Sequence, residues 1–150
     1  MRAREATEAD AELLLSWRND PRTRQSSRST AVVTLAEHLG WLRRVLADEE
    51  RLLLVVEHED ASIGTVRFDR RDGDGWEVSI TLAPETRGRG LSGAVLAEGE
   101  RAARERLGVR VVLAAVHQDN TASAKLFEHA GYAEAAPAVS GFRQLRKTLS

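Results

Sequence analysis

The chain of 150 residues contains no cysteine. Disulfides, thiolate metal sites and cysteine nucleophiles are therefore excluded. A surplus of positive charge is also missing, since 22 basic residues stand against 23 acidic ones and the formal net charge is -1. A nucleic-acid-binding domain is normally clearly basic, so nucleic acid is not an expected partner.

Long apolar runs are absent as well. The N-terminal segment has acidic residues where a signal peptide would be positive, and its apolar run is only residues 13–15. No stretch approaches the length that crosses a bilayer, so we expect a cytoplasmic protein without a membrane partner. The length, together with the lack of repeats and linkers, predicts one domain over residues 1–150.

What is present is a change of apolar spacing from helical to alternating, which predicts an α/β fold. Capping sequences at Thr7 and Thr34 begin two helices, the first of which ends at Asp20-Pro21. Residues 89–107 are predicted to form a third helix, and Asn120 caps a fourth. Between the first two helices we expect a polar loop, with arginines Arg18, Arg22, Arg24 and Arg28. Strands are predicted at 52–57, 62–69, 76–82, 109–116, about 132–136 and 141–148.

The segment Gly88-Arg89-Gly90-Leu91-Ser92-Gly93 satisfies the G-x-G-x-x-G fingerprint of dinucleotide-binding Rossmann folds. Too little chain follows Gly93 for the further β-α units of that fold, and residues 84–87 separate the glycines from the preceding strand. No Gly-Lys-Ser/Thr follows, so a P-loop is excluded. Ala94 stands where G-x-S-x-G needs its last glycine, so Ser92 is not an elbow nucleophile.

The same segment still has the properties of an anion-binding turn. Gly88 and Gly90 let the backbone approach an anion closely, and the amides of residues 88–93 open a helix whose positive end faces it. Arg87 and Arg89 add charge-assisted donors. The alternative is a solvated turn that only caps the helix.

Two motifs in this order resemble the GNAT N-acetyltransferase superfamily. Arg87-Gly88-Arg89-Gly90-Leu91-Ser92 is similar to its acyl-CoA motif R/Q-x-x-G-x-G/A, and the segment from Asn120 and Ser123 to Gly131-Tyr132 is similar to N-x-x-A/S…G-F/Y. The resemblance implies one mixed, mostly antiparallel sheet flanked by helices. Its expected order is strand, two helices, three strands, helix, strand, helix and two strands.

The resemblance also implies acetyl-CoA as co-substrate, with no metal. Its pyrophosphate would lie on the amides of residues 87–93 and its pantetheine along Leu82-Ala83. The implied cofactor-binding residues are Leu82, Ala83, Arg87, Gly88, Arg89, Gly90, Leu91, Ser92, Gly93, Asn120 and Ser123. Phe127 stands where many members have the tyrosine that protonates the leaving thiolate. We therefore expect the thiolate to leave unprotonated or to take a proton from water.

The implied reaction is direct attack of a primary amine on the thioester, with a backbone amide near Leu82 as oxyanion donor. An alkylammonium has a pKa of about 10, so a base has to take its proton. Glu77 is the candidate, because family members often place a carboxylate on this strand and Val78 alternates to the opposite face. Two alternatives stay open: Glu77 is an exposed residue paired with Arg67 across the strands, or His117 is the base.

The acceptor wall of this family comes from the first two helices and their loop, here the segment with Trp17, Arg18, Asn19, Arg22, His38 and Trp41. Together with Arg67-Phe68 it is similar to bacterial acetyltransferases acting on amino-sugar nucleotides, as in pseudaminic-acid-type pathways. Arginines suit a diphosphate and Trp41 could stack on a sugar or base, so the predicted substrate-binding residues are Arg18, Asn19 and Trp41. The alternative is that the two tryptophans pack in the hydrophobic core and the arginines belong to a solvated loop.

The expected partner is therefore a small-molecule amine, and a homodimer is left open. Two other functions are also left open. One is acetylation of protein α-amines, as in the ribosomal-protein group, although a peptide groove would prefer acidic or backbone-pairing groups. The other is a catalytically silent acyl-CoA-binding module.

Overall fold

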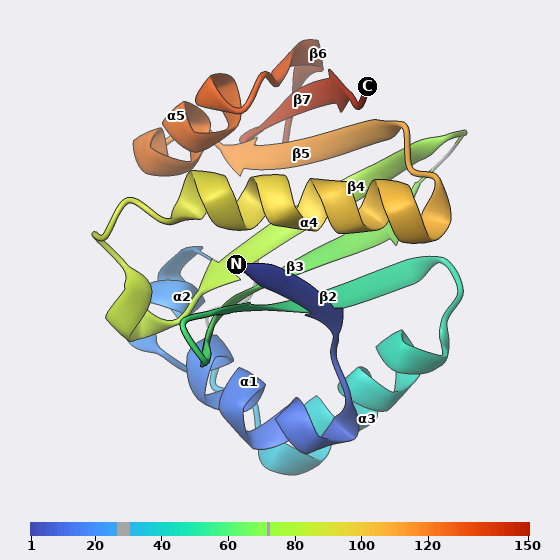
Figure 1. The fold of residues 1–150 in the computed structure, drawn as a ribbon. Coiled ribbons are helices and arrows are strands. Elements are labelled where there is room, and N and C mark those ends of the chain that lie inside the picture. The colour runs from blue at the N-terminus through green and yellow to red at the C-terminus, as the bar shows by residue number, and fades with distance from the viewer. Residues whose placement is uncertain (27–30, 72) are drawn as a thin grey trace.

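The computed structural model describes residues 1–26, 31–71 and 73–150, and the predicted loop residue Arg28 lies outside these ranges. In the described part, seven strands form one sheet in the order β1-β2-β3-β4-β5-β7-β6 (Figure 1). The strands are β1 (Arg2–Glu5), β2 (Arg51–His58), β3 (Ala61–Arg70), β4 (Gly75–Leu82), β5 (Val111–His117), β6 (Ala133–Val139) and β7 (Phe142–Thr148). The helices are α1 (Ala11–Arg18), α2 (Pro21–Ser26), α3 (Leu35–Ala47), α4 (Ser92–Leu107) and α5 (Thr121–His129), with short 3-10 turns η1 (Glu8–Asp10) and η2 (Pro84–Thr86).

The predicted mixed α/β sheet is confirmed. Every neighbouring pair of strands is antiparallel except β4 and β5, which are parallel because α4 crosses over between them. Two predictions about the helices were wrong. The segment predicted as a loop contains α2, which starts at Pro21, a residue suited to the first helical position. The helix predicted from residue 89 begins only at Ser92, because Gly88 and Gly90 have φ of +73° and cannot continue a helix.

Helices cover both faces of the sheet. Alternation along β3 directs Val66 and Phe68 toward α4 and α5, while Leu53 and Val55 of β2 face α1 and α3. Figure 1 shows α4 lying across one face and α1 with α3 on the other side. Helix α4 approaches β3 closely because residue 99 is glycine: a Cβ there would lie 2.7 Å from Cγ1 of Val66.

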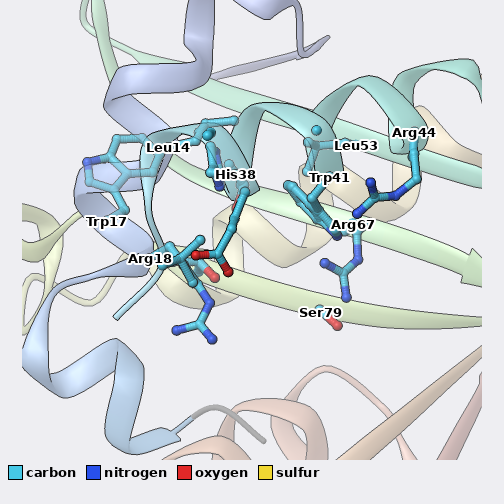
Figure 2. A pocket seen from close by; sticks show the side chains of 15 residues that line it. Leu14, Trp17, Arg18, His38, Trp41, Arg44, Leu53, Arg67 and Ser79 are labelled. Carbon is cyan, nitrogen blue, oxygen red and sulfur yellow. The ribbon is translucent and has the colours of Figure 1, made fainter. Parts of the chain in front are cut away.

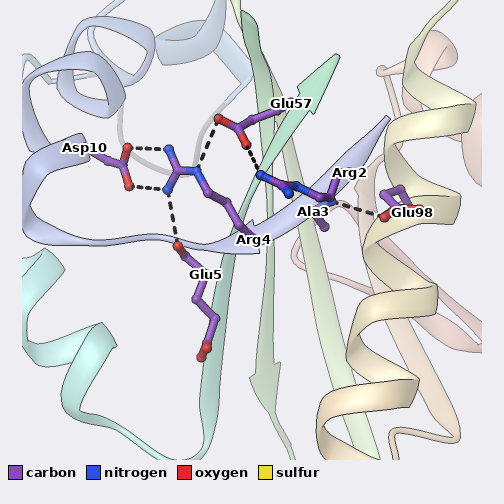
Figure 3. A network of polar contacts seen from close by, with 7 residues as sticks. All are labelled: Arg2, Ala3, Arg4, Glu5, Asp10, Glu57 and Glu98. Carbon is purple, nitrogen blue, oxygen red and sulfur yellow. Dashed lines mark hydrogen bonds and ion pairs between the residues drawn. The ribbon is translucent and has the colours of Figure 1, made fainter. Parts of the chain in front are cut away.

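The N-terminal strand is fixed by the polar network in Figure 3. The Arg4 guanidinium donates to both carboxylate oxygens of Asp10, at 2.9 and 2.8 Å. Asp10 also accepts from the amide of Thr7 at 2.8 Å, which completes the predicted capping sequence. The amide of Ala3 donates to Oε1 of Glu98 on α4 at 3.1 Å. These contacts join β1 to a helix on each side of the sheet.

Strands β4 and β5 separate before they end. Their parallel register runs from Gly75 to Glu77, where Glu77 lies opposite Leu113, and no later pair is formed in the described chain. Strand β4 stays paired with β3 as far as Leu82. Main-chain groups of residues 78–82 on the β5 side therefore have no strand partner among the described residues. The two strands therefore splay apart toward Leu82, the residue near which the resemblance implies the oxyanion donor.

Candidate active site

The turn before α4 has the geometry of an anion cradle. Gly88 and Gly90 both have φ of +73°, and nothing lies within 4 Å of where a Cβ would stand on either. No described residue accepts a hydrogen bond from the amides of residues 88–94. These donors open a 16-residue helix, whose first turn leaves amides unsatisfied and carries partial positive charge. The turn therefore fits a diphosphate.

A cavity of about 400 Å³ extends from this turn along the splayed part of β4 to the start of α5. It brings together six of the predicted cofactor residues: Leu82, Arg87, Gly88, Ser92, Asn120 and Ser123. The carboxamide of Asn120 accepts from the amide of Ser123 at 3.0 Å, so Asn120 caps α5 while it borders the cavity.

The other five predicted cofactor residues do not line the cavity. Ala83 has no exposed surface and packs with α1 and α3, and the side chain of Leu91 packs on the core beneath α4. Arg89, Gly90 and Gly93 are exposed at the turn. Their backbone amides remain available to an anion, so their assignment stays a prediction.

Arg87 uses its guanidinium differently from the prediction. Its Nη1 donates to Oδ2 of Asp20 and its Nη2 to Oγ1 of Thr23, both at 2.6 Å. The Arg87 guanidinium therefore holds the pKa of Asp20 below its usual value. The side chain was expected to bind an anion, but in this structure it ties the turn to the segment that contains α2.

A larger cavity, of about 620 Å³, lies on the α1 and α3 face of the sheet. Its walls come from α1, α3 and strands β2 to β4, as Figure 2 shows. The predicted substrate residues Arg18 and Trp41 line it. Asn19 does not line it: its carboxamide donates to the carbonyl of Val33 and accepts from the amide of Val33, each at 2.8 Å. Asn19 therefore fixes Val33 in the wall of the cavity, and its predicted role in substrate binding stays a prediction.

The larger cavity is positively charged. Among the described residues that line it are three guanidinium groups, from Arg18, Arg44 and Arg67, and one carboxylate, from Glu37. Arg67 is held in place twice, because its Nε donates to Oδ2 of Asp69 at 3.0 Å and its guanidinium carbon lies 5.5 Å from the centre of the Trp41 ring. Such a fixed fork suits a phosphate or carboxylate ligand.

His38 also lines this cavity and is 5% exposed. Its ring centre lies 5.4 Å from that of Trp41, at an interplanar angle of 33°. No described residue makes a hydrogen bond to its Nε2 atom. Burial, helped by the charge of Arg18, lowers the pKa of His38. The sequence placed His38 in the acceptor wall but gave it no role.

The two cavities meet at Thr81, which lines both. Ser79 and Thr81 point to the α1 and α3 face, since they alternate with the buried Val78. Sequence reasoning missed both residues. The signal was available, because alternation from Glu77 places residues 79 and 81 on the same face.

Glu77 lies on the expected face of β4 but lines neither cavity. Its Oε2 accepts from Nη2 of Arg71 at 2.9 Å, and its side chain is 20% exposed. The alternative that paired Glu77 with Arg67 does not fit the strand register, because the β3 residue opposite Glu77 is Asp69. The role of Glu77 as base stays a prediction.

His117, the alternative base, is exposed at the end of β5 and lines neither cavity. Its Nδ1 accepts from the amide of Asp119 at 3.1 Å, and its ring meets the edge of Phe142 at 5.3 Å.

Phe127 is 5% exposed and packs edge-on against Tyr132 at 5.0 Å. Tyr132 is the chain's one tyrosine, and its hydroxyl donates to Oε2 of Glu100 at 2.6 Å. Burial raises the pKa of this hydroxyl well above its usual value. Tyr132 therefore cannot replace the tyrosine that is missing at position 127.

Two further properties concern the described residues as a group. None of their helices combines the length and apolar character that a membrane crossing requires. They also contain no group of three or more His, Asp or Glu side chains placed to hold a metal ion.

Comparison with known proteins gives the family. Residues 1–133 match the family model described as the acetyltransferase (GNAT) domain. Acetyltransferase PseH of Campylobacter jejuni subsp. jejuni is 27% identical over 124 residues, which are 83% of this chain and 77% of PseH.

Solved structures agree with this family. A ribosomal-protein-alanine N-acetyltransferase from Brucella melitensis is 27% identical with a TM-score of 0.80, and the match covers 99% of this chain and 100% of that one. The fold is also that of a spermidine N-acetyltransferase from Vibrio cholerae in complex with CoA and spermine, with 17% identity and a TM-score of 0.84 over 97% and 94% of the two chains. The chain therefore belongs to the GNAT acetyltransferase family, and it is an N-acetyltransferase whose acetyl donor is acetyl-CoA.

Proposed function

We propose that this enzyme acetylates the primary amine of a small anionic molecule such as an amino-sugar nucleotide. The observation that carries the proposal is the larger cavity with its three guanidinium groups, which shares Thr81 with the cavity at the cofactor turn. An amine that enters from the α1 and α3 face would meet the acetyl group beside Thr81. The similarity to Acetyltransferase PseH supports the acetyl-transfer part of this proposal.

The chain has the groups to hold acetyl-CoA, which would supply an activated acetyl thioester. The amides of residues 88–93 would bind its diphosphate, and the unpaired edge of β4 would bind the pantetheine arm. Asn120 and Ser123 would border that arm. A backbone amide of β4 near Leu82 would donate to the carbonyl oxygen as negative charge develops there.

The acceptor's anionic part would bind among Arg18, Arg44 and Arg67. Arg67 is already oriented by Asp69 and Trp41, so little ordering of this side chain accompanies binding. The Trp41 ring offers a flat apolar surface to a sugar or a base. These contacts would hold the amine toward β4.

A panel of acceptors tests this proposal through release of the CoA thiol. It contains a UDP-linked primary amino sugar, the same sugar without UDP, spermidine, and a peptide with N-terminal alanine. Hydrogen bonds to charged groups contribute about 1.5–3 kcal/mol each. One such contact corresponds to about 10–100-fold in kcat/KM in favour of the UDP-linked sugar, and the preference should decline with salt. A higher kcat/KM for spermidine would contradict the proposal.

A second candidate is acetylation of protein α-amines. It is favoured by the 27% identity, over almost the full length, to the Brucella ribosomal-protein-alanine acetyltransferase. In the panel, this function gives the highest kcat/KM with the alanine peptide. Binding of CoA without thiol release on any amine is the outcome expected of a silent module.

A further inference from the structure

Arg22 of α2 lines the smaller cavity, which extends from the glycine turn before α4. The resemblance placed this residue in the acceptor wall, but it is not among the described residues that line the larger cavity. Its side chain is exposed, and no described residue forms an ion pair or a hydrogen bond with its guanidinium. The guanidinium is therefore accessible to a molecule bound in the smaller cavity.

The main chain of Arg22 is fixed beside the glycine turn by the side chain of Asp20. Oδ2 of Asp20 accepts from the amide of Arg22 at 3.1 Å and from Nη1 of Arg87 at 2.6 Å. Arg87 directly precedes Gly88, where the backbone takes its positive φ. Figure 1 shows α2 beside the yellow-green segment that leads into α4. One carboxylate oxygen thus holds Arg22 next to the amides that fit a diphosphate.

The wall of the smaller cavity is cationic. Arg22 and Arg87 are the ionisable residues among the described ones that line it, and that set contains no carboxylate. Asp20 balances the charge of Arg87, whereas no described carboxylate forms an ion pair with Arg22. The amides of the turn stabilise an anion through partial charges, and a guanidinium adds a full charge with charge-assisted hydrogen bonds. Arg22 can therefore supply the charge that the turn itself lacks.

We propose that the guanidinium of Arg22 binds the diphosphate of acetyl-CoA, the role that the sequence had assigned to the side chain of Arg87. The inference rests on the proposed placement of the diphosphate on the amides of residues 88–93. It does not depend on which amine accepts the acetyl group. It makes α2, which the resemblance assigned to the acceptor side, part of the coenzyme site.

Calorimetry with CoA tests the inference on Arg22→Gln and on a matched control, Arg110→Gln. Arg110 is also exposed, and it precedes β5 at the end of that strand away from the smaller cavity. Arg22→Gln should raise the Kd for CoA about 5–10-fold, less than a buried charged contact would give, because the side chain is exposed. Arg110→Gln removes the same charge and should leave the Kd unchanged. An unchanged Kd in Arg22→Gln would overturn the proposal.

Two further measurements separate a contact between charges from a disturbance of α2. The difference in Kd between Arg22→Gln and the native protein should shrink from about 50 mM to about 500 mM salt, because salt screens exposed charges. Arg22→Lys keeps the charge but not the planar fork, so it should recover part of the lost affinity. A loss that is as large in Arg22→Lys and does not respond to salt would overturn the proposal, because it would come from the structure of α2.

A second ligand, 3′-dephospho-CoA, identifies the phosphate that Arg22 binds. This molecule keeps the diphosphate of CoA and lacks its 3′-phosphate. Binding at the diphosphate predicts that Arg22→Gln loses affinity for 3′-dephospho-CoA by the same factor as for CoA. A loss that appears with CoA and disappears with 3′-dephospho-CoA would place Arg22 at the 3′-phosphate and overturn the assignment.

Gly88→Ala, titrated in the same way, separates this inference from the placement on which it rests. If Gly88→Ala weakens CoA binding and Arg22→Gln does not, the diphosphate binds at the turn and the role of Arg22 is refuted. If neither variant weakens binding, the placement and the inference both fall. Because the Arg22 guanidinium bonds to no described residue, Arg22→Gln without ligand should unfold at the same midpoint temperature as the native protein.

Discussion

Gly88 and Gly90 are the residues on which recognition of the acetyl donor depends most directly. Their φ of +73° is costly for a residue with a Cβ, by about 1–2 kcal/mol, although each has open space around it. We predict that Gly88→Ala or Gly90→Ala weakens CoA binding about 5–30-fold, as measured by calorimetry.

The matched control is Gly73→Ala. Gly73 has φ of +70° and equally open surroundings, but it lies in the turn between β3 and β4. This substitution should lower the midpoint of thermal unfolding and leave the Kd for CoA unchanged. If all three variants bind CoA as the native protein does, the cradle is not where the diphosphate binds.

Single residues also show which features could be predicted from the sequence and which could not. The glycine turn could be predicted because its geometry depends on neighbours in sequence. The contact of Asn19 with Val33 could not be predicted, because Val33 lies 14 residues away and only the fold brings the two together. The alternative that paired Glu77 with Arg67 does not fit, because strand register places Asp69, and not Arg67, opposite Glu77.

At the scale of elements, the contact between α4 and β3 sets the separation of helix and sheet beneath the cofactor turn. In Gly99→Ala the new Cβ would lie 2.7 Å from Cγ1 of Val66, a branched side chain with little freedom to move. Overpacking costs about 1–3 kcal/mol and outweighs the roughly 1 kcal/mol that alanine adds in a helix. We predict a net loss in the free energy of unfolding, measured with urea.

Two further variants separate packing from helix propensity. Gly40→Ala on α3 meets Arg44 at an ordinary 3.5 Å and should be neutral or stabilising. The double variant Gly99→Ala, Val66→Ala should lose less stability than the sum of its two single variants, because they act on one contact. If the losses are additive, the close approach of residue 99 to Val66 is not the cause of the lower stability of Gly99→Ala.

Most elements could be predicted because spacing and capping are local properties. The capping box at Thr34 is an example: its hydroxyl accepts from the amide of Glu37 at 3.2 Å and donates to its carboxylate at 2.8 Å. Helix α2 was missed since Pro21 was interpreted as a stop, although proline also begins helices. The larger cavity could not be predicted in shape, because five separate elements form its walls.

At the scale of the whole molecule, acid should destabilise the fold in two stages. Burial lowers the pKa of His38, so below about pH 6.5 the unfolded chain binds more protons than the native state and stability starts to fall. Hydrogen bonds from Arg4, Arg87 and Arg101 hold the pKa values of Asp10, Asp20 and Glu98 below their usual values. The stability that these three carboxylates contribute is complete above about pH 4.5 and is lost as the pH falls further.

Urea unfolding at pH 8, 5.5 and 3.5 checks this prediction. In His38→Gln, the free energy of unfolding should no longer decrease between pH 8 and 5.5, but it should still decrease between pH 5.5 and 3.5. In His117→Gln, both decreases should remain. A decrease between pH 8 and 5.5 that survives in His38→Gln would assign the first stage to other groups.

The hydrogen bonds from Arg87 to Asp20 and Thr23 affect how the enzyme binds its coenzyme. They anchor the glycine-rich turn to a distant part of the chain before any ligand arrives, even though glycine is the residue with the greatest backbone freedom. Preorganisation of this kind limits the entropy lost when the donor docks. A salt bridge that touches no reacting atom can thereby set the affinity of the enzyme for its coenzyme.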